Sequence, residues 1–385
     1  MTAVAAALLA TLSQAPAMEA VPPPEPSAPT LDVAAPQPPA PVSAPSLPAW
    51  LERMEVSGFA RVGVFYTLPL GNEDLIGGRG GFRMADLRLN HAFRISEKLS
   101  TYVSVEFAAP RVTSEDPLAG YRAVELRDGY VDYRAHRAIG FRAGQFRPPY
   151  YAEMLLSDAA VPFTGRSVIA SGLAPPEGYG PREGLAPERQ VGVQASSERL
   201  GVGESFGARY AVGVFNGNGQ NAVFNDNNAL ATYGRVELDW TQRVTLGVNA
   251  YQNTRALGTR PNRVYGTELG YGADVAVVAG GFQALAGILG KDVSYSAGLP
   301  ADRAWGVLAQ ARYVHEETGL EGAVRGAVLE PSTGQQADQV TEVTAMAGYR
   351  LAKGTRLLVQ YRLHAEEKAT TVSNDSVDAM VHVTW

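Results

Sequence analysis

The chain has 385 residues and a formal net charge of −6, with hydrophobic residues at 45% and charged residues at 19%. These values exclude a disordered chain and a strongly polyionic one, so the overall charge indicates no nucleic-acid partner. The sequence contains no Cys, which excludes disulfides and thiolate metal sites and is compatible with a protein of the cell envelope.

The N-terminal part predicts two segments without a fold of their own. Residues 3–12 form an apolar run, and Ala15-Pro16-Ala17 follows as a small-x-small cleavage pattern, so we expect a signal peptide over 1–17. No Lys or Arg precedes the run, which leaves open a longer leader or a disordered Ala-rich tail. Residues 18–50 are rich in Pro and Ala and predict a disordered linker. We expect the folded domain over 51–385.

From Val56 onward, polar and apolar residues alternate in about sixteen segments of strand length. No stretch after the predicted signal peptide approaches the roughly 18 apolar residues of a membrane helix, whereas a strand tilted across a bilayer needs only about 9–11 residues. We expect strands over 56–68, 83–95, 99–108, 124–135, 138–147, 189–197, 206–215, 229–240, 243–253, 263–275, 279–289, 303–314, 319–329, 340–351, 355–365 and 376–385.

The connections between these segments alternate in length. Short turns fall at 96–98, 136–137, 241–242, 316–318 and 352–354, and longer loops fall at 69–82, 109–123, 148–188, 216–228, 290–302, 330–339 and 366–375. A membrane barrel with periplasmic termini produces this rhythm, and a sheet in lipid must close because unpaired backbone groups there cost several kcal/mol each. The predicted fold class is therefore all-β: a transmembrane antiparallel β-barrel of about 16 strands.

The alternation also assigns the two faces of each strand. Polar side chains point into the lumen, and a barrel of this size leaves an aqueous channel. The inferred lumen charges nearly balance in sign, so they fit either a ladder for anions or a wet lumen that braces a loop. The predicted pore-lining residues are Arg88, Arg94, Asp128, Asp132, Arg142, Arg312, Arg356 and Arg362.

Aromatic residues recur at one end of the strands. The alternation places Phe93, Tyr133, Trp240, Tyr313, Tyr349 and Trp385 on the lipid face near the periplasm, which predicts an aromatic girdle. Strands favour aromatics in any case, so chance placement is the alternative. The last strand ends in Trp385 and resembles the strand that outer-membrane proteins present to the barrel-assembly machinery. We therefore expect the bacterial outer membrane, with its lipid and lipopolysaccharide as partners.

An ordered set of short motifs resembles the phosphate-selective porin O and P family over about residues 56–240. The motifs are DLRL (86–89), VSVEF (103–107), FRAGQFRPP (141–149), GRS (165–167), RQVGVQ (189–194) and YAVGVFNGNGQN (210–221). The C-terminal third matches only through its strand pattern and terminal aromatic. The resemblance implies a sixteen-stranded, usually homotrimeric porin whose third loop folds inward to narrow the pore. Phosphate-preferring members use lysines in that loop, and residues 148–188 contain none.

Segment 148–188 is the predicted constriction loop. Structureless loops above about 12–15 residues are usually functional or disordered, so a mobile surface loop is the alternative. The residues that we expect to act in the constriction are Tyr150, Tyr151, Glu153, Arg166 and Arg182.

No pattern of catalytic residues stands out. The five His have no metal-ligand spacing, and there is no nucleophile elbow or H-E-x-x-H motif. We therefore predict no enzymatic activity, no metal and no cofactor. The predicted function is an outer-membrane channel for passive diffusion of small hydrophilic solutes, including anions such as phosphate. The alternative is a structural or surface-interaction barrel whose lumen is blocked.

Overall fold

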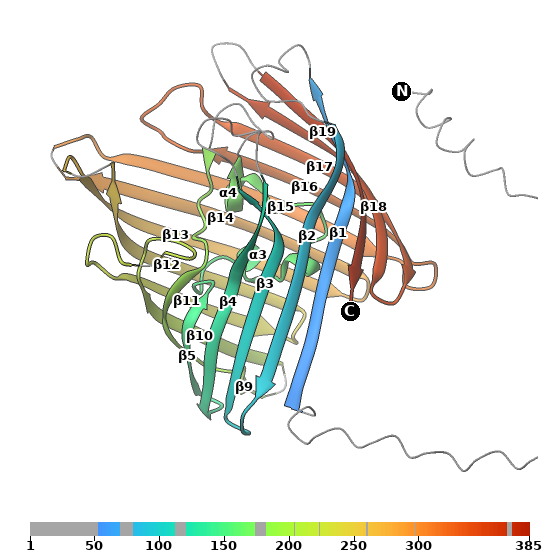
Figure 1. Ribbon diagram of the computed structural model, residues 1–385, viewed down its shortest axis with the longest axis horizontal. Coiled ribbons are helices and arrows are strands. Elements are labelled where there is room, and N and C mark those ends of the chain that lie inside the picture. The colour runs from blue at the N-terminus through green and yellow to red at the C-terminus, as the bar shows by residue number, and fades with distance from the viewer. Residues whose placement is uncertain are drawn as a thin grey trace, which may run out of the picture. The chain divides into compact units, whose positions relative to one another are not determined.

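The computed structural model describes residues 53–69, 80–111, 121–173, 182–203, 205–222, 224–258, 261–296, 298–367 and 372–385. The predicted signal peptide and linker lie outside these residues. The main sheet contains 17 strand segments, and β1 pairs with both β2 and β19, which closes the sheet into a barrel (Figure 1). Strands β8 and β9 pair with successive parts of β10, so they share one of sixteen positions. The predicted barrel is confirmed.

The strands run antiparallel to their neighbours around the barrel. Their bounds are β1 (Met54–Pro69), β2 (Gly81–Arg94), β3 (Leu99–Arg111), β4 (Tyr121–His136), β5 (Ile139–Phe146), β8 (Gln190–Ser196), β9 (Leu200–Val202), β10 (Phe206–Phe215), β11 (Ala231–Trp240), β12 (Val244–Leu257), β13 (Val264–Ala279), β14 (Phe282–Tyr295), β15 (Asp302–Val314), β16 (Leu320–Glu330), β17 (Val340–Ala352), β18 (Thr355–Glu366) and β19 (Val372–Thr384).

Each predicted strand overlaps one position of the barrel, and both boundaries of β14 differ from the prediction: the strand ends at Tyr295 instead of 289, and the turn before it is also displaced. The alternation placed this turn at 276–278, but β13 continues to Ala279 and the chain turns at Gly280-Gly281. Gly280 has a φ of 55°, which glycine adopts without strain. A Cβ on Gly281 would lie 2.1 Å from the carbonyl oxygen of Val314, so only glycine fits there. This constraint comes from Val314 on the neighbouring strand, so the alternation of polar and apolar residues along one strand cannot reveal it.

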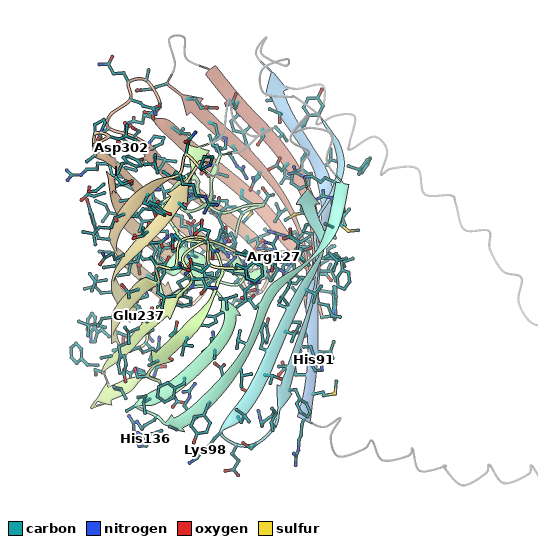
Figure 2. The ribbon with its side chains drawn as sticks, turned by 60° about the vertical axis from the view of Figure 1, so that its left-hand side comes forward. His91, Lys98, Arg127, His136, Glu237 and Asp302 are labelled. Carbon is teal, nitrogen blue, oxygen red and sulfur yellow. The ribbon has the colours of Figure 1, made fainter. Side chains whose placement is uncertain are left out.

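The short turns and both ends of the barrel sequence lie together. The backbone NH of Gly58 donates to the carbonyl of Trp385 at 3.0 Å, and the reverse bond is 3.1 Å long. In Figure 2, Lys98 and His136 mark this short-turn end and Asp302 marks the long-loop end. Five of the predicted girdle residues are at least 44% exposed, and Phe93 is half-buried; the five are Tyr133, Trp240, Tyr313, Tyr349 and Trp385.

The segment between β5 and β8 enters the barrel (Figure 1). We call residues 147–173 and 182–189 the inner loop. It contains the helices α3 (Ala152–Leu155), η2 (Asp158–Ala160) and α4 (Val168–Ser171), followed by β6 (Gly172–Leu173), which pairs with β7 (Arg182–Glu183). Helix α4 packs against β15 and β16. No helix within the described ranges is long and apolar enough to cross a membrane.

The inner loop rests on an apolar part of the barrel wall, which we call the loop seat. Its inward-facing residues on β14–β16 are buried and apolar: Leu285, Leu289, Ala304, Leu308, Ala327 and Leu329. The expectation that inward positions are polar is therefore wrong here. These positions face the loop instead of water, and burial of apolar surface stabilises the contact. The alternation of residues could not distinguish inward positions that face the loop from inward positions that face water.

Two glycines make room in the wall around the loop seat. A Cβ on Gly287 would lie 2.7 Å from the ring of Tyr151, and a Cβ on Gly306 would lie 2.7 Å from the side chain of Ile169. Tyr151 and Ile169 are completely buried. Tyr151 also has a positive φ of 52°, a conformation that a bulky residue keeps only when its surroundings hold it. The loop is therefore fitted to the wall by shape.

Candidate functional site

Arg325 on β16 is the main charged anchor of the inner loop, and its side chain is 0% exposed. Its Nη1 lies 3.1 Å from Oε1 of Glu342, and its Nη2 donates to the carbonyl of Gly165 at 3.1 Å. The guanidinium also lies 4.1 Å from the ring centroid of Phe163. A buried charge of this kind is tolerated only when it is paired and hydrogen-bonded. Arg325 thus fixes the middle of the loop to the wall.

Two buried carboxylates orient the start of α4. Ser167 donates two hydrogen bonds to the carboxylate of Glu153, one from its backbone NH at 2.8 Å and one from its hydroxyl. The next backbone NH, that of Val168, donates to Oε2 of Glu342 at 2.8 Å. These NH groups have no partner within the short helix, so the carboxylates satisfy them. Glu153 comes from the loop and Glu342 from β17, so the helix is held from both sides.

Thr164 binds the wall where the first and last strands meet. Its hydroxyl donates to Asp378 of β19 at 2.9 Å, and its carbonyl accepts from Arg61 of β1 at 3.3 Å. Its backbone NH donates to Oε1 of Gln360 on β18 at 3.0 Å. One loop residue therefore touches three strands.

Three of the predicted pore-lining arginines are largely buried, with side chains that are 8–11% exposed: Arg312, Arg356 and Arg362. Arg356 donates to the carbonyl of Val161 at 2.9 Å, and Arg362 donates to the hydroxyl of Thr164 at 3.0 Å. Arg312 pairs with Glu321 on the same part of the wall. The structure places Arg356 and Arg362 against the loop, and all three side chains have little contact with water.

On its opposite side, the inner loop borders a cavity of about 220 Å³ against the wall formed by β2–β5. We call it the arginine cavity. Asp128 is the one carboxylate among the described residues that line it, with the neutral polar groups of Asn90, Ser104 and Ser157. The four guanidiniums that line it are those of Arg88, Arg142, Arg147 and Arg189. Its surface is therefore cationic, although the charges of the whole lumen nearly balance.

The carboxylates that pair with these arginines stand mostly outside the lining. Asp132 accepts from Nε and Nη2 of Arg142 at 2.8 and 2.9 Å, and Glu106 accepts from Nε of Arg88 at 3.2 Å. Neither acid lines the cavity. Pairs of this kind fix the direction of a guanidinium, because both partners are held by charge-assisted hydrogen bonds. The acids thus hold the arginines in place while the arginines face the cavity.

Asp158 ties the inner loop to the same wall. Arg88 donates to its Oδ2 at 2.5 Å, and Arg147 donates to its Oδ1 at 3.0 Å. Arg166, a predicted constriction residue, also contacts this carboxylate and donates to the carbonyl of Leu156 at 2.8 Å. Burial raises the pKa of Asp158, but the neighbouring guanidiniums outweigh burial and hold the pKa well below its usual range.

Arg142 is the arginine of the cavity that is most open to water, with its side chain 32% exposed. Its guanidinium lies 3.9 Å from the ring centroid of Tyr130, which is the spacing of a stacked cation–π contact. Tyr130 in turn stacks on Tyr102, with ring centroids 5.2 Å apart and planes 24° from parallel. A rigid aromatic platform therefore presents this charge to the lumen.

The other predicted residues lie in different places. Tyr150 donates from its hydroxyl to the carbonyl of Tyr271 at 3.1 Å, and both Tyr150 and Tyr151 are too buried to meet a solute. Arg94 is exposed near the short-turn end. The backbone of Arg182 is part of β7, and its side chain lies outside the described residues.

Two arginines of the cavity were missed by the sequence analysis. Arg147 directly follows β5 and Arg189 directly precedes β8, so each stands at an end of the inner loop. The Nε of Arg189 donates to Asp128 at 3.0 Å. Both belong to motifs of the family resemblance, FRAGQFRPP and RQVGVQ, which was the available signal. The alternation placed Arg147 and Arg189 at the ends of the predicted strands 138–147 and 189–197, whereas both lie just outside β5 and β8 and belong to the inner loop.

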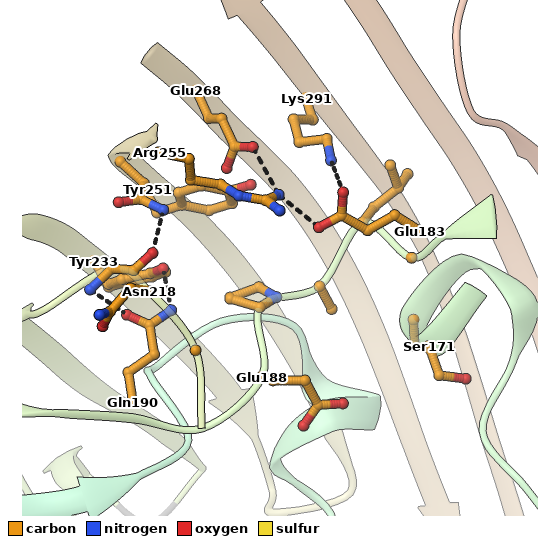
Figure 3. Close-up of a pocket in the computed structure, with 18 of the residues that line it drawn as sticks. Ser171, Glu183, Glu188, Gln190, Asn218, Tyr233, Tyr251, Arg255, Glu268 and Lys291 are labelled. Carbon is orange, nitrogen blue, oxygen red and sulfur yellow. Dashed lines mark hydrogen bonds and ion pairs between the residues drawn. The ribbon is translucent and has the colours of Figure 1, made fainter. Parts of the chain in front are cut away.

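A second cavity, of about 340 Å³, lies beside the β7 end of the inner loop (Figure 3). Four of its charged groups are paired with each other: Arg255 lies 2.6 Å from Glu183 and 3.1 Å from Glu268, and Lys291 lies 3.8 Å from Glu183. Glu188 and Asp226 also line this cavity, so its lining has four carboxylates against two cationic groups and is anionic. Within the described part of the chain, no group of three or more His, Asp or Glu residues could hold a metal ion.

The family pattern described as Gram-negative porin matches residues 4–369. The chain belongs to this family. The closed barrel agrees with that assignment, and this porin is accordingly a protein of the bacterial outer membrane. The matched family is broader than the phosphate-selective porins that the motifs resemble. A search of curated proteins gives no match.

Three solved structures with the same fold are distant from this chain in sequence. The anion-selective porin from Comamonas acidovorans has a TM-score of 0.59 at 13% identity, covering 86% of this chain and 99% of that chain. The outer-membrane channel DcaP of Acinetobacter baumannii has a TM-score of 0.58 at 14% identity, covering 86% and 97%. OmpF from Salmonella typhi, in complex with daunomycin, has a TM-score of 0.60 at 12% identity, covering 86% and 97%. These likenesses show the fold alone.

Proposed function

We propose that this porin is a passive channel for small hydrophilic solutes and that it prefers anions. The observation that carries the proposal is the lining of the arginine cavity, in which four guanidiniums face one carboxylate. Anion-selective pores are lined by Arg or Lys, and cation-selective pores by Asp or Glu. The arginine cavity is the space that remains between the inner loop and the wall formed by β2–β5, so this cavity is the candidate constriction.

The distances explain how a lumen with nearly balanced charges favours one sign. A solute in the cavity meets the guanidiniums directly, whereas Asp132 and Glu106 lie outside the lining. Coulomb energy falls with distance, and charges in a narrow passage with protein walls act more strongly than charges in open water. The nearer charges therefore decide the preference.

Phosphate is one of the anions that we expect to pass. Arginine suits both carboxylate and phosphate through its fork of NH donors, so the cavity is suited to either group. The inner loop contains no Lys, unlike that of the phosphate-preferring porins that the motifs resemble. We therefore propose phosphate as a permeant anion without the specificity of that family.

Single-channel recording of the refolded protein in planar bilayers tests this function. We expect discrete open steps in chloride and a zero-current potential, across a salt gradient, that reports anion preference. A potential of the opposite sign would contradict the anion preference. A well-folded protein without steps would support the alternative, a barrel whose lumen the inner loop blocks; the packing of the loop on its seat is the observation that keeps this alternative open. We propose no catalytic activity.

The partners follow from the outer-membrane location. We propose contact of the exposed wall with lipid and lipopolysaccharide, and recognition of the last strand, which ends at Trp385, by the barrel-assembly machinery. We also propose a homotrimer, because the porins that the motifs resemble are usually trimeric. Migration as a single chain after extraction in mild detergent would contradict the trimer.

A further inference from the structure

Two leucines of the inner loop are exposed within the lumen. Leu155 is 42% exposed and Leu156 is 37% exposed, and both line the arginine cavity. Apolar side chains that face water gain free energy when another apolar group covers them. The loop side of the cavity therefore offers an apolar surface, while the wall side offers charge.

Arg142 on the wall side keeps one donor group available. Asp132 takes its Nε and Nη2, and Nη1 has no partner among the described residues. Tyr130 covers one face of the guanidinium at 3.9 Å. The remaining edge can donate to an anionic group in the cavity without giving up the pair with Asp132. A planar donor of this kind suits a carboxylate.

We propose that the arginine cavity selects organic carboxylates with an apolar body over inorganic anions and over acetate. The carboxylate binds the free edge of Arg142, and the apolar body lies against Leu155 and Leu156. This inference rests on the proposed anion channel and names its substrate class. The cavity volume of about 220 Å³ lies below the range of about 300–1,000 Å³ that is usual for drug-sized ligands, so a body of one ring or a short chain fits best.

The physical basis is the apolar surface that a solute covers in addition to its charge. Chloride, phosphate and acetate interact with the arginines but cover little or none of the leucine surface. Benzoate has the same carboxylate as acetate and adds a ring that covers apolar area at about 25 cal/mol per Å². Benzoate and acetate therefore separate the apolar contribution from the charge.

The test measures the chloride current through single channels in planar bilayers at neutral pH while benzoate, acetate or phosphate is added. Covering about 50 Å² of apolar surface corresponds to roughly tenfold in affinity, so benzoate should halve the current at about a tenfold lower concentration than acetate. Phosphate covers no apolar surface, so its block should be the same in the wild type and in the leucine variant described below. The zero-current potential, recorded in the same channels without additions, reports the anion preference independently.

The matched variants change only the apolar side. In the double variant Leu155→Ser with Leu156→Ser, benzoate should lose its advantage over acetate, while the zero-current potential stays as in the wild type. The control is Leu299→Ser, because Leu299 is 51% exposed and does not line the cavity. It should keep the tenfold ratio. Heat-dependent migration on gels checks that each variant is folded.

The outcomes separate this inference from the proposed function. Equal block by benzoate and acetate in an anion-preferring wild type would overturn the inference and leave the channel proposal standing. A benzoate advantage that persists in the double leucine variant would place the apolar contact elsewhere and also overturn it. A cation-preferring or silent wild type would overturn the proposed function itself.

Discussion

Replacement of Arg142 by Gln gives the sharpest test of the cavity's charge. The side chain is the most exposed of the four arginines that line the cavity, and its removal also uncovers the carboxylate of Asp132. An anion about 5 Å from a guanidinium in water gains about 0.8 kcal/mol, which corresponds to roughly fourfold in partitioning. Arg142→Gln should therefore lower the ratio of anion to cation permeability by about fourfold or more.

The assay is the zero-current potential across a salt gradient in planar bilayers, at low and at high ionic strength. The effect should shrink in high salt, because mobile ions screen charges beyond a Debye length of about 3 Å at 1 M. Asp132→Asn should change the ratio in the opposite direction, since it leaves Arg142 uncompensated. The matched control is Arg94→Gln, an exposed arginine near the short-turn end and outside the cavity lining. Equal shifts for Arg142→Gln and Arg94→Gln would refute the assignment of selectivity to this cavity.

Three further predictions concern the inner loop and use heat-induced unfolding in detergent. Arg325→Met leaves two buried carboxylates without their partner and should destabilise the barrel by about 3–5 kcal/mol. Gly287→Ala pushes a methyl group into the ring of Tyr151 and should cost about 1–3 kcal/mol, whereas Gly326→Ala, with no atom within 4 Å of the added Cβ, should change little. Asp158→Asn should lower stability by the same amount from neutral pH down to about pH 4, and by less at lower pH.

The sign of the pH effect follows from the depressed pKa of Asp158. A lowered folded-state pKa stabilises the native state above the unfolded value of about 3.9, and the stabilisation is lost as the pH falls through the folded-state pKa. A difference between wild type and Asp158→Asn that already disappears at mildly acidic pH would contradict this account. For the loop seat, equal unfolding temperatures for Gly287→Ala and Gly326→Ala would show that the loop does not press on the wall. An Arg325→Met barrel as stable as the wild type would show that the anchor is dispensable.

The strands were predictable from the sequence because each one alternates between lipid and lumen. That period identifies a strand and its two faces without any knowledge of its neighbours. It does not say what an inward side chain meets. Leu285 and Leu308 face inward but meet the inner loop, and Arg356 faces inward but binds the carbonyl of Val161. The alternation therefore identified correctly which side chains face the lumen. The expectation that all of these side chains meet water was wrong.

The candidate site depended on contacts across long stretches of chain. The inner loop is held by Arg325, more than a hundred residues away, and no local pattern indicates that pairing. The same holds for Arg147 and Arg189, which come together with Arg142 only when β5 and β8 pair across the base of the loop. The local sequence pattern identified the strands and the long loop. Only the folded structure shows which of their arginines line the same cavity.

The position of Thr164 has a consequence for how the barrel closes. Strands β1 and β19 come from opposite ends of the sequence, so their pairing is the most distant contact in the sheet and carries the largest cost in chain entropy. Thr164 accepts from Arg61 on one side of that junction and donates to Asp378 on the other. The inner loop thus links β1 to β19 from inside the barrel. Thr164 can make both hydrogen bonds only after the first and last strands have paired.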